Sequence, residues 1–196
     1  MTILNNFTSV FGADAVAAIG ITQKIYMVPM YISMGISQGI MPLVSYNYAS
    51  GNQKRMKAAI VFAGEISIGF ITTAAVFFYF GAEGVVQFFM DNPSIIAYGI
   101  RFMRGFCLGL PFLCMDFLAV GVFQALGYGK NALVFAIMRK IVLEIPALYL
   151  LNYLFPLYGL AYAQFVAEFV LAIAAVVQLL LIFRKLGKKQ VYIEDV

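Results

Sequence analysis

Residues 158–183 read YGLAYAQFVAEFVLAIAAVVQLLLIF, and Glu168 is the only charged side chain among them. A helix needs about 20 predominantly apolar residues to cross a hydrocarbon core of ~30 Å, and this stretch is long enough. Other stretches of similar length and character cover residues 25–46, 58–80, 105–126 and 131–154. The sequence therefore predicts membrane-spanning helices that fill nearly the whole chain.

The composition favours a membrane protein and argues against an enzyme. Hydrophobic residues make up 63% of the 196-residue chain, charged residues make up 11%, and the mean hydropathy is +0.93. In soluble proteins charged residues are about a quarter of the chain, and a soluble domain of this size has too little interior to bury such helices on every face. The chain has no histidine, which excludes Ser-His catalysis and histidine-ligated zinc. We expect an all-α polytopic transmembrane helix bundle with no enzyme activity, metal site or cofactor.

Basic residues lie at alternate connections between the predicted spans, and the other connections hold none until Arg101 and Arg104, at the entrance to the third span. Lys54, Arg55 and Lys57 follow the first span, Lys130 follows the third, and Arg184 follows the fifth. Basic loops are retained on the cytoplasmic side of a membrane, so the sequence predicts a multi-pass cell-membrane protein with a cytoplasmic C-terminus. Because this segregation leaves no basic patch, nucleic acid is not an expected partner.

Residues 3–11 precede the first span and have the pattern of a helix end that is closed by Gly12. An odd number of spans with a cytoplasmic C-terminus places the start of the first span outside the cell. We therefore interpret residues 3–11 as the last turns of a helix that began earlier. The alternative is a short segment that lies at the membrane interface.

Asp116 lies near the middle of the third predicted span. Gly105, Gly109, Phe112 and Ala119 share its helical face, and the two glycines form a GxxxG pattern that lets another helix approach closely. The carboxyl group is therefore expected to point toward neighbouring helices or a cavity. An ionisable group at this depth is costly and marks a functional candidate, which favours a role in cation or proton coupling. The alternative is a neutral acid that is hydrogen-bonded to a neighbouring helix.

Other charged residues also lie within the predicted spans. Lys140 and Glu144 are four residues apart and therefore on one helical face, which predicts a structural ion pair. Arg139 lies close enough to the cytoplasmic side for its side chain to extend to that boundary. Glu65 and Glu168 are weaker candidates for coupling than the acid of the third span.

One face of the first span carries thioether, aromatic and amide side chains at intervals of three or four residues. These are Met27, Tyr31, Met34, Gln38 and Met41. Such groups form an adaptable surface, so we interpret this stripe as facing a substrate such as an apolar cation. The alternative is a stripe that packs against another helix, and Gly35 with Gly39 offers a second GxxxG surface beside it.

Residues 35–52 read GISQGIMPLVSYNYASGN and are followed at residues 54–57 by KRMK. This run resembles the end of the eighth transmembrane helix, and the cytoplasmic loop after it, in bacterial MATE (multidrug and toxic compound extrusion) transporters. Further segments resemble the same family in the same order along the chain. They are residues 16–21, residues 123–127 with Lys130, and residues 139–146.

MATE transporters are two-lobe exporters with six helices in each lobe, and they exchange organic cations for sodium ions or protons. The resemblance implies that residues 1–196 form a single membrane domain, the C-terminal lobe, with about five full spans and a truncated first helix. It also implies multidrug efflux across the plasma membrane by cation antiport. Asp116 falls in the tenth helix, where some members carry a coupling acid. The expected partners are the lipid bilayer, small organic cations, and an N-terminal lobe or a second copy of this chain.

Two other functions remain open at the level of the sequence. A related lipid-linked oligosaccharide flippase has the same general architecture, and a cavity dominated by arginine and lysine would favour it. The other alternative is a truncated, non-transporting helical fragment, because alternating access needs two halves that move against each other and this chain supplies one.

Overall fold

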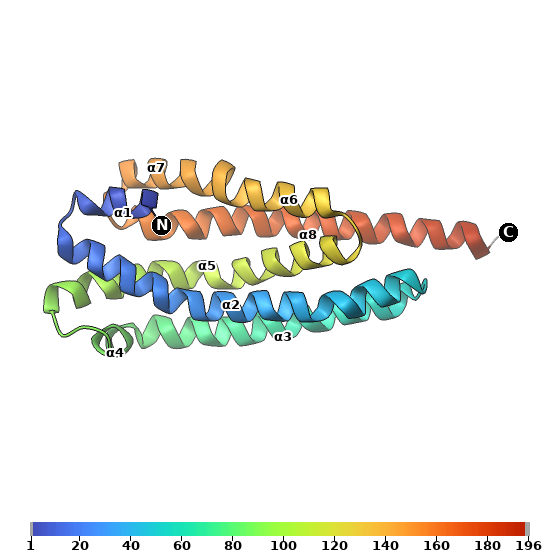
Figure 1. The fold of residues 1–196 in the computed structure, drawn as a ribbon, viewed down its shortest axis with the longest axis horizontal. Helices are drawn as coiled ribbons and strands as arrows, with labels where there is room; N and C mark the ends of the chain where they lie inside the picture. Colours follow the sequence, from blue (N-terminus) through green and yellow to red (C-terminus); the bar gives the residue numbers. More distant parts are fainter. Residues whose placement is uncertain (1, 195–196) are drawn as a thin grey trace.

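The computed structural model describes the backbone of residues 2–194, together with the side chains of residue 4 and residues 6–184. Its long helices run along one axis as an elongated bundle (Figure 1). In chain order the elements are α1 (Thr2–Ser9), α2 (Ala13–Ala49), α3 (Gln53–Phe80), α4 (Ala82–Gln87), α5 (Pro93–Ala125), α6 (Gly129–Ile137), the π-helix η1 (Met138–Glu144), α7 (Ile145–Leu154) and α8 (Gly159–Glu194). Residues 2–194 contain no strand, so the prediction of an all-α bundle is confirmed.

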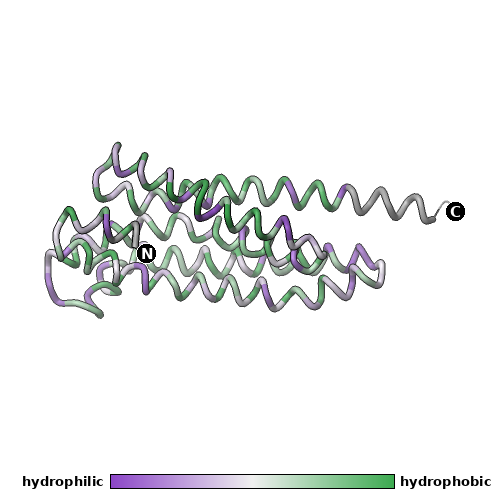
Figure 2. Tube along the Cα trace, turned by 45° about the horizontal axis from the view of Figure 1, so that its top comes forward, coloured by the Kyte–Doolittle hydropathy of each residue, from purple (hydrophilic) through white to green (hydrophobic). Residues whose placement is uncertain are grey.

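Within the described part of the chain, α2, α3, α5 and α8 are each long and apolar enough to cross a membrane. They contain the predicted spans 25–46, 58–80, 105–126 (apart from its last residue) and 158–183 (apart from its first residue). Figure 2 shows apolar residues along these helices and hydrophilic residues at many of the turns between them. This distribution is the one that a bundle surrounded by lipid needs, because every backbone polar group inside the hydrocarbon must be satisfied within a helix.

The predicted span 131–154 is helical, but it is not one regular α-helix. α6 passes directly into η1, and η1 passes directly into α7. Pro146 lies in the first turn of α7, and its ring and missing N–H disfavour α-helical hydrogen bonds in the turn before it. Hydropathy locates this span, but it does not report the hydrogen-bond register within it. π-Helical segments are rare and are frequently found at functional sites.

The predicted helix end before Gly12 is present. α1 ends at Ser9, and the N–H of Phe11 donates to the carbonyl oxygen of Thr8 at 2.9 Å. Gly12 has a φ of 103°, a conformation that side chains with a Cβ rarely adopt. The chain therefore turns at this glycine from α1 into α2.

Gly127 ends α5 in a second glycine turn. Its φ is 80°, its N–H donates to the carbonyl oxygen of Gln124 at 3.0 Å, and the N–H of Tyr128 donates to that of Phe123 at 2.8 Å. These two bonds form the Schellman pattern that closes a helix. The turn directs the chain into α6 and brings η1 back alongside the bundle (Figure 1).

α5 is the central helix, and its glycine face packs against α8. A Cβ added to Gly105 would lie 2.6 Å from the Cβ of Ala161, and one added to Gly109 would lie 3.5 Å from the Cα of Phe165. Small residues allow two helices in a membrane to approach this closely. The predicted GxxxG contact of α5 is therefore confirmed.

α5 and α2 are joined by serine hydroxyl groups. Ser37 Oγ donates to the carbonyl oxygen of Phe117 at 2.6 Å, and Ser45 Oγ donates to that of Ala125 at 2.9 Å. Gly121 lies directly against Ser37, where a Cβ would collide with the hydroxyl group. Hydrogen bonds of this kind hold polar side chains between helices in a membrane.

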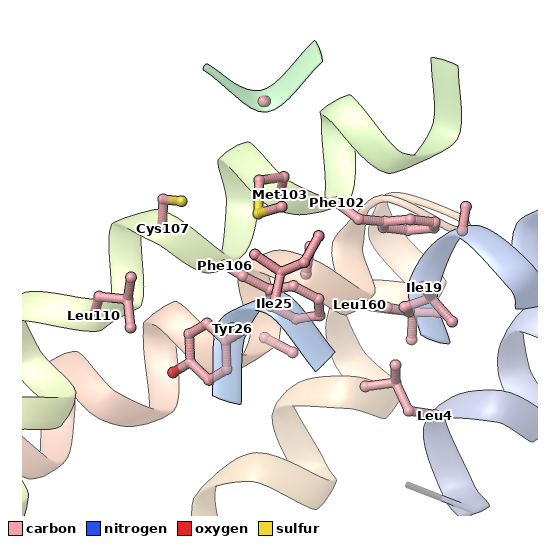
Figure 3. Close-up of a cluster of buried hydrophobic side chains, with 14 of the residues drawn as sticks. Leu4, Ile19, Ile25, Tyr26, Phe102, Met103, Phe106, Cys107, Leu110 and Leu160 are labelled. Carbon is pink, nitrogen blue, oxygen red and sulfur yellow. The ribbon is translucent and has the colours of Figure 1, made fainter. Parts of the chain in front are cut away.

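Buried apolar side chains form two clusters along the bundle. Figure 3 shows part of the first cluster, in which Phe102 and Phe106 of α5 lie near Ile19 of α2. Along α5 the first cluster ends at Cys114, and the second begins at Leu118. The same break occurs along α8, between Ala163 and Leu171. Buried charged residues occupy the interval between the two clusters.

Candidate functional site

Charged side chains from three elements meet at one depth, between the two apolar clusters. At 1.5 Å per residue, Asp116 lies about 15 Å from the end of its predicted span at residue 126, and Glu168 lies about 15 Å from the start of its span at residue 158. Arg139 lies about 12 Å from residue 131 by the same reckoning. A hydrocarbon core is ~30 Å thick, so all three residues are expected near its middle.

Asp116 and Arg139 form an ion pair. Nη1 of Arg139 donates to Oδ2 of Asp116 at 3.2 Å, and the two side chains are 18% and 3% exposed, respectively. The guanidinium also lies over the ring of Phe117, 4.8 Å from its centroid, which is a cation–π contact. The prediction that Asp116 faces a neighbouring helix is confirmed, and its role in coupling stays a prediction.

The expectation that Arg139 extends toward the cytoplasmic boundary is wrong. Its guanidinium points into the bundle, toward Asp116. The buried carboxylate and the half-buried guanidinium each offset part of the other's desolvation cost, and sequence periodicity does not reveal such a partner on another helix. The pair joins α5 to η1, so the irregular π-helical segment is anchored at a buried charge.

Glu168 is the most deeply buried charged side chain of α8 in the described range, with 1% of its surface exposed. Its Oε2 has no hydrogen-bond partner among the described residues. Glu65, the other weaker candidate from the sequence, is exposed on α3. The signal that singles out Glu168 is in the sequence: it is the one charge in the most apolar stretch, where an ionisable group is costly.

A cavity of about 530 Å³ lies beside the ion pair. Its charged walls are Arg139, Lys140 and Glu144 of η1 and Glu168 of α8. Gln164 and Tyr26 add polar groups to the wall of the cavity. Nε2 of Gln164 donates to the hydroxyl oxygen of Tyr26 at 2.9 Å. Small-molecule sites are typically about 300–1,000 Å³ in volume, with apolar walls and a few polar groups. This cavity has the size and chemistry of such a site.

Lys140 and Glu144 form the predicted ion pair, with 2.6 Å between Nζ and Oε2. Its structural role stays a prediction. Together with the deeper pair, the site holds the carboxyl groups of Asp116, Glu144 and Glu168 and the basic groups of Arg139 and Lys140. With every group ionised the site therefore has one carboxylate more than it has cations, inside a bundle where an uncompensated charge is costly.

The stripe on α2 divides between the cavity and the outer surface. Met27 lines the cavity, whereas Tyr31, Met34 and Gln38 are exposed and Met41 is half-buried. These exposed side chains do not pack within the bundle, so the packing alternative is wrong for them inside this chain. Whether they face a substrate stays a prediction.

The second GxxxG surface is also not used within this chain. A Cβ added to Gly35 or to Gly39 would have no described atom within 4 Å. The expectation that close packing occurs at these two glycines is therefore wrong for the contacts that the structure describes. They leave a small, open surface on α2, beside Met34 and Gln38.

Comparison with known proteins gives a consistent result. The MatE family model matches residues 1–150. Multidrug export protein MepA of Staphylococcus haemolyticus is 34% identical over 174 residues, which are 88% of this chain and 38% of that protein. The fold matches an outward-facing conformation of a multidrug resistance MATE family transporter with a TM-score of 0.88 at 19% identity, over 96% of this chain and 43% of that one.

An inward-facing conformation of a multidrug resistance MATE family transporter matches with a TM-score of 0.86 at 19% identity, over 94% of this chain and 43% of that one. At these identities the structural likeness shows the fold alone. The chain spans less than half the length of the relatives that it matches. Because the family model covers most of its residues, the chain belongs to the MatE family of membrane transporters.

Proposed function

We propose that this chain works as the C-terminal lobe of a multidrug exporter, which moves organic cations out across the cell membrane in exchange for sodium ions or protons. The observation that carries the proposal is the charged layer at Asp116, Arg139 and Glu168, buried in a bundle that has the fold of MATE transporters. A purely structural bundle gains little from buried charge, because burying ions is costly even when they are paired.

In this mechanism Asp116 couples cation binding to the position of η1. A proton or a sodium ion on the carboxylate competes with the Arg139 guanidinium, which now lies 3.2 Å away. Losing the ion pair frees η1 from α5 and biases the lobe toward its other orientation. The similar fit of this chain to outward-facing and inward-facing neighbours supports a lobe that moves largely as a unit, as alternating access requires.

The substrate would lie between the two lobes, against the stripe on α2. Met27 lines the cavity, and the exposed side chains of Tyr31, Met34 and Gln38, followed by Met41, continue the same helical face. Thioether and aromatic groups suit flat apolar cations of differing shape. The second lobe, either an N-terminal half or another copy of this chain, would complete the site from the opposite side.

A flippase for lipid-linked oligosaccharides is less well supported. It would be favoured by a cavity dominated by basic groups that bind phosphate. The charged walls of the cavity are Arg139 and Lys140 on one hand and Glu144 and Glu168 on the other. Basic groups therefore do not dominate the cavity, and with Asp116 beside it the site has one carboxyl group more than it has basic groups, which favours a cationic ligand.

Efflux of ethidium tests the proposal. Cells that lack other exporters would express this chain alone, this chain with an N-terminal MATE lobe, or that lobe alone. We expect efflux when both lobes are present, its collapse when the coupling gradient is removed, and its loss in the Asp116→Asn variant. If the chain is confirmed in the membrane and no combination gives efflux, a non-transporting helical fragment is the better account.

A further inference from the structure

We infer that Glu168 is a second carboxylate of the coupling site, and that Asp116 and Glu168 share the guanidinium of Arg139. A single monovalent cation then neutralises whichever of the two acids is not paired with the guanidinium. This inference rests on the proposed function, and it adds α8 to a mechanism that otherwise involves α5 and η1.

The burial of Glu168 is the first observation that supports this sharing. Its side chain is 1% exposed, and its Oε2 is buried with no hydrogen-bond partner among the residues that the structure describes. A carboxylate buried in this way is strongly unfavourable unless a positive charge reaches it. The position therefore calls for a cation, and Glu168 faces a cavity with room for one.

The second step is the spare capacity of Arg139. A guanidinium carries five N–H donors in a planar fork. One of them, on Nη1, serves Asp116, while Nε is buried and unpaired among the described atoms. Arg139 and Glu168 line the same cavity from facing elements. The proposed exchange moves the guanidinium from Asp116 to Glu168 across this shared cavity.

The third step is the balance of charge around Glu168. The ionisable groups that surround it are Asp116 on α5, Arg139, Lys140 and Glu144 on η1, and Tyr26 on α2. Lys140 is already engaged by Glu144 at 2.6 Å. Arg139 is thus the one intramolecular cation left for two acids in this described set. One further positive charge is needed to neutralise both acids, and a proton or a sodium ion carries one.

The exchange couples ion binding to shape. When the guanidinium pairs with Asp116, as in this structure, the ion pair links η1 to α5 and the cation binds at Glu168. When the guanidinium pairs with Glu168, the ion pair links η1 to α8 and the cation binds at Asp116. η1 already departs from α-helical hydrogen bonding, and such irregular segments accommodate movement more readily than a regular helix.

An apolar carbodiimide tests which acid lacks a counter-ion, because it modifies protonated carboxyl groups and spares ion-paired carboxylates. The purified full chain in detergent is treated with the reagent, and the modified residues are mapped by mass spectrometry. We expect modification of Glu168 in clear excess over Asp116. In the Arg139→Gln variant both acids should react, since neither has the guanidinium.

Two arms of this experiment identify the cation. If it is sodium, NaCl should protect Glu168 while choline chloride at the same concentration does not. If it is a proton, rising pH should protect it equally in NaCl and in choline chloride. Modification of Asp116 with Glu168 spared, or modification of Glu168 that neither sodium nor pH changes, would overturn the inference.

A binding measurement separates this inference from the proposed function. The thermal unfolding midpoint of the wild-type chain should shift with the sodium concentration or with the pH, whichever the labelling identifies, and Glu168→Gln should lose that shift. Glu65→Gln, which removes an exposed acid on α3, should keep it, and Glu168→Asp should restore it in part. A shift that survives Glu168→Gln would refute the role of Glu168 whatever the efflux assay shows. A Glu168-dependent shift without efflux would count against the proposed function alone.

Discussion

At the scale of single residues, Arg139 and Asp116 should contribute unequally to stability although they form one pair. Arg139→Gln leaves Asp116 and Glu168 as two buried acids without a guanidinium, whereas Asp116→Asn leaves Arg139 free to pair with Glu168. Removing one partner of a buried ion pair costs roughly 3–5 kcal/mol. We expect a loss of this size for Arg139→Gln and a clearly smaller one for Asp116→Asn, measured by thermal unfolding in detergent.

The double variant Asp116→Asn with Arg139→Gln is the control for this comparison. It removes one of the two acids that Arg139→Gln leaves unpaired, so its unfolding midpoint should be higher than that of Arg139→Gln alone. Equal losses in the two single variants would contradict the sharing of Arg139 between two acids, because each variant would then break one isolated pair.

The sequence was sufficient for those residues whose partners are close along the chain or on the same helix face. Lys140 and Glu144 are one turn apart and form the predicted pair. Asp116 points inward because small residues share its face. The partner of Arg139 could not be predicted, since it lies 23 residues away on another helix. For Glu168 the sequence does carry a signal, since it is the one charge in the most apolar stretch.

At the scale of elements, the contact between α5 and α8 should tolerate added bulk at one glycine and not at the next. A Cβ on Gly105 would lie 2.6 Å from the Cβ of Ala161, which forces the helices apart, whereas one on Gly109 would lie 3.5 Å from the nearest atom. Overpacking typically costs about 1–3 kcal/mol. We expect a cost in this range for Gly105→Ala and little for Gly109→Ala, measured by thermal unfolding. A larger loss for Gly109→Ala would show that the helices approach differently.

Hydropathy predicted the elements better than their internal geometry. It located the membrane-crossing parts of α2, α3, α5 and α8, because burial in lipid demands long apolar runs. It did not report the first turns of α2, which begins at Ala13, because they lie outside the most apolar stretch. It also missed η1, because a change from i+4 to i+5 hydrogen bonds leaves the apolar content unchanged.

At the scale of the whole molecule, the fold gathers the basic connections at one end. The α2–α3 turn, the α5–α6 turn and the C-terminal part of α8 lie together, while α4 and the α7–α8 turn lie at the opposite end (Figure 1). If the basic end is cytoplasmic, a chain with Cys107 and Cys114 replaced by alanine should show it. Lys130→Cys should react with a membrane-impermeant maleimide only in permeabilised cells, and Glu83→Cys should react in intact cells. The reverse pattern would invert the proposed orientation.

The exposed faces of α2 and α3 differ in chemistry, which indicates different surroundings. α3 presents Phe62, Ile66 and Phe70, which are large and apolar, as suits contact with lipid tails. α2 also exposes large apolar side chains, among them Val28 and Leu43, but it adds Gly35, Gln38 and Gly39, which are small or polar. Small and polar residues favour contact between helices in a membrane. The second lobe is therefore expected against α2 and not against α3.

A photoreactive benzophenone side chain can report this difference directly. Tyr31 on α2 and Phe62 on α3 are aromatic and similarly exposed, at 59% and 63%, so reactivity should depend on what each one faces. With a tagged N-terminal lobe in the same membrane, the probe at position 31 should crosslink to that lobe, and the probe at position 62 should react with lipid alone. Crosslinks between two copies of this chain at position 31 would make a second copy the partner. Crosslinks to the lobe from position 62 alone would move the interface to α3 and remove the α2 stripe from the substrate path.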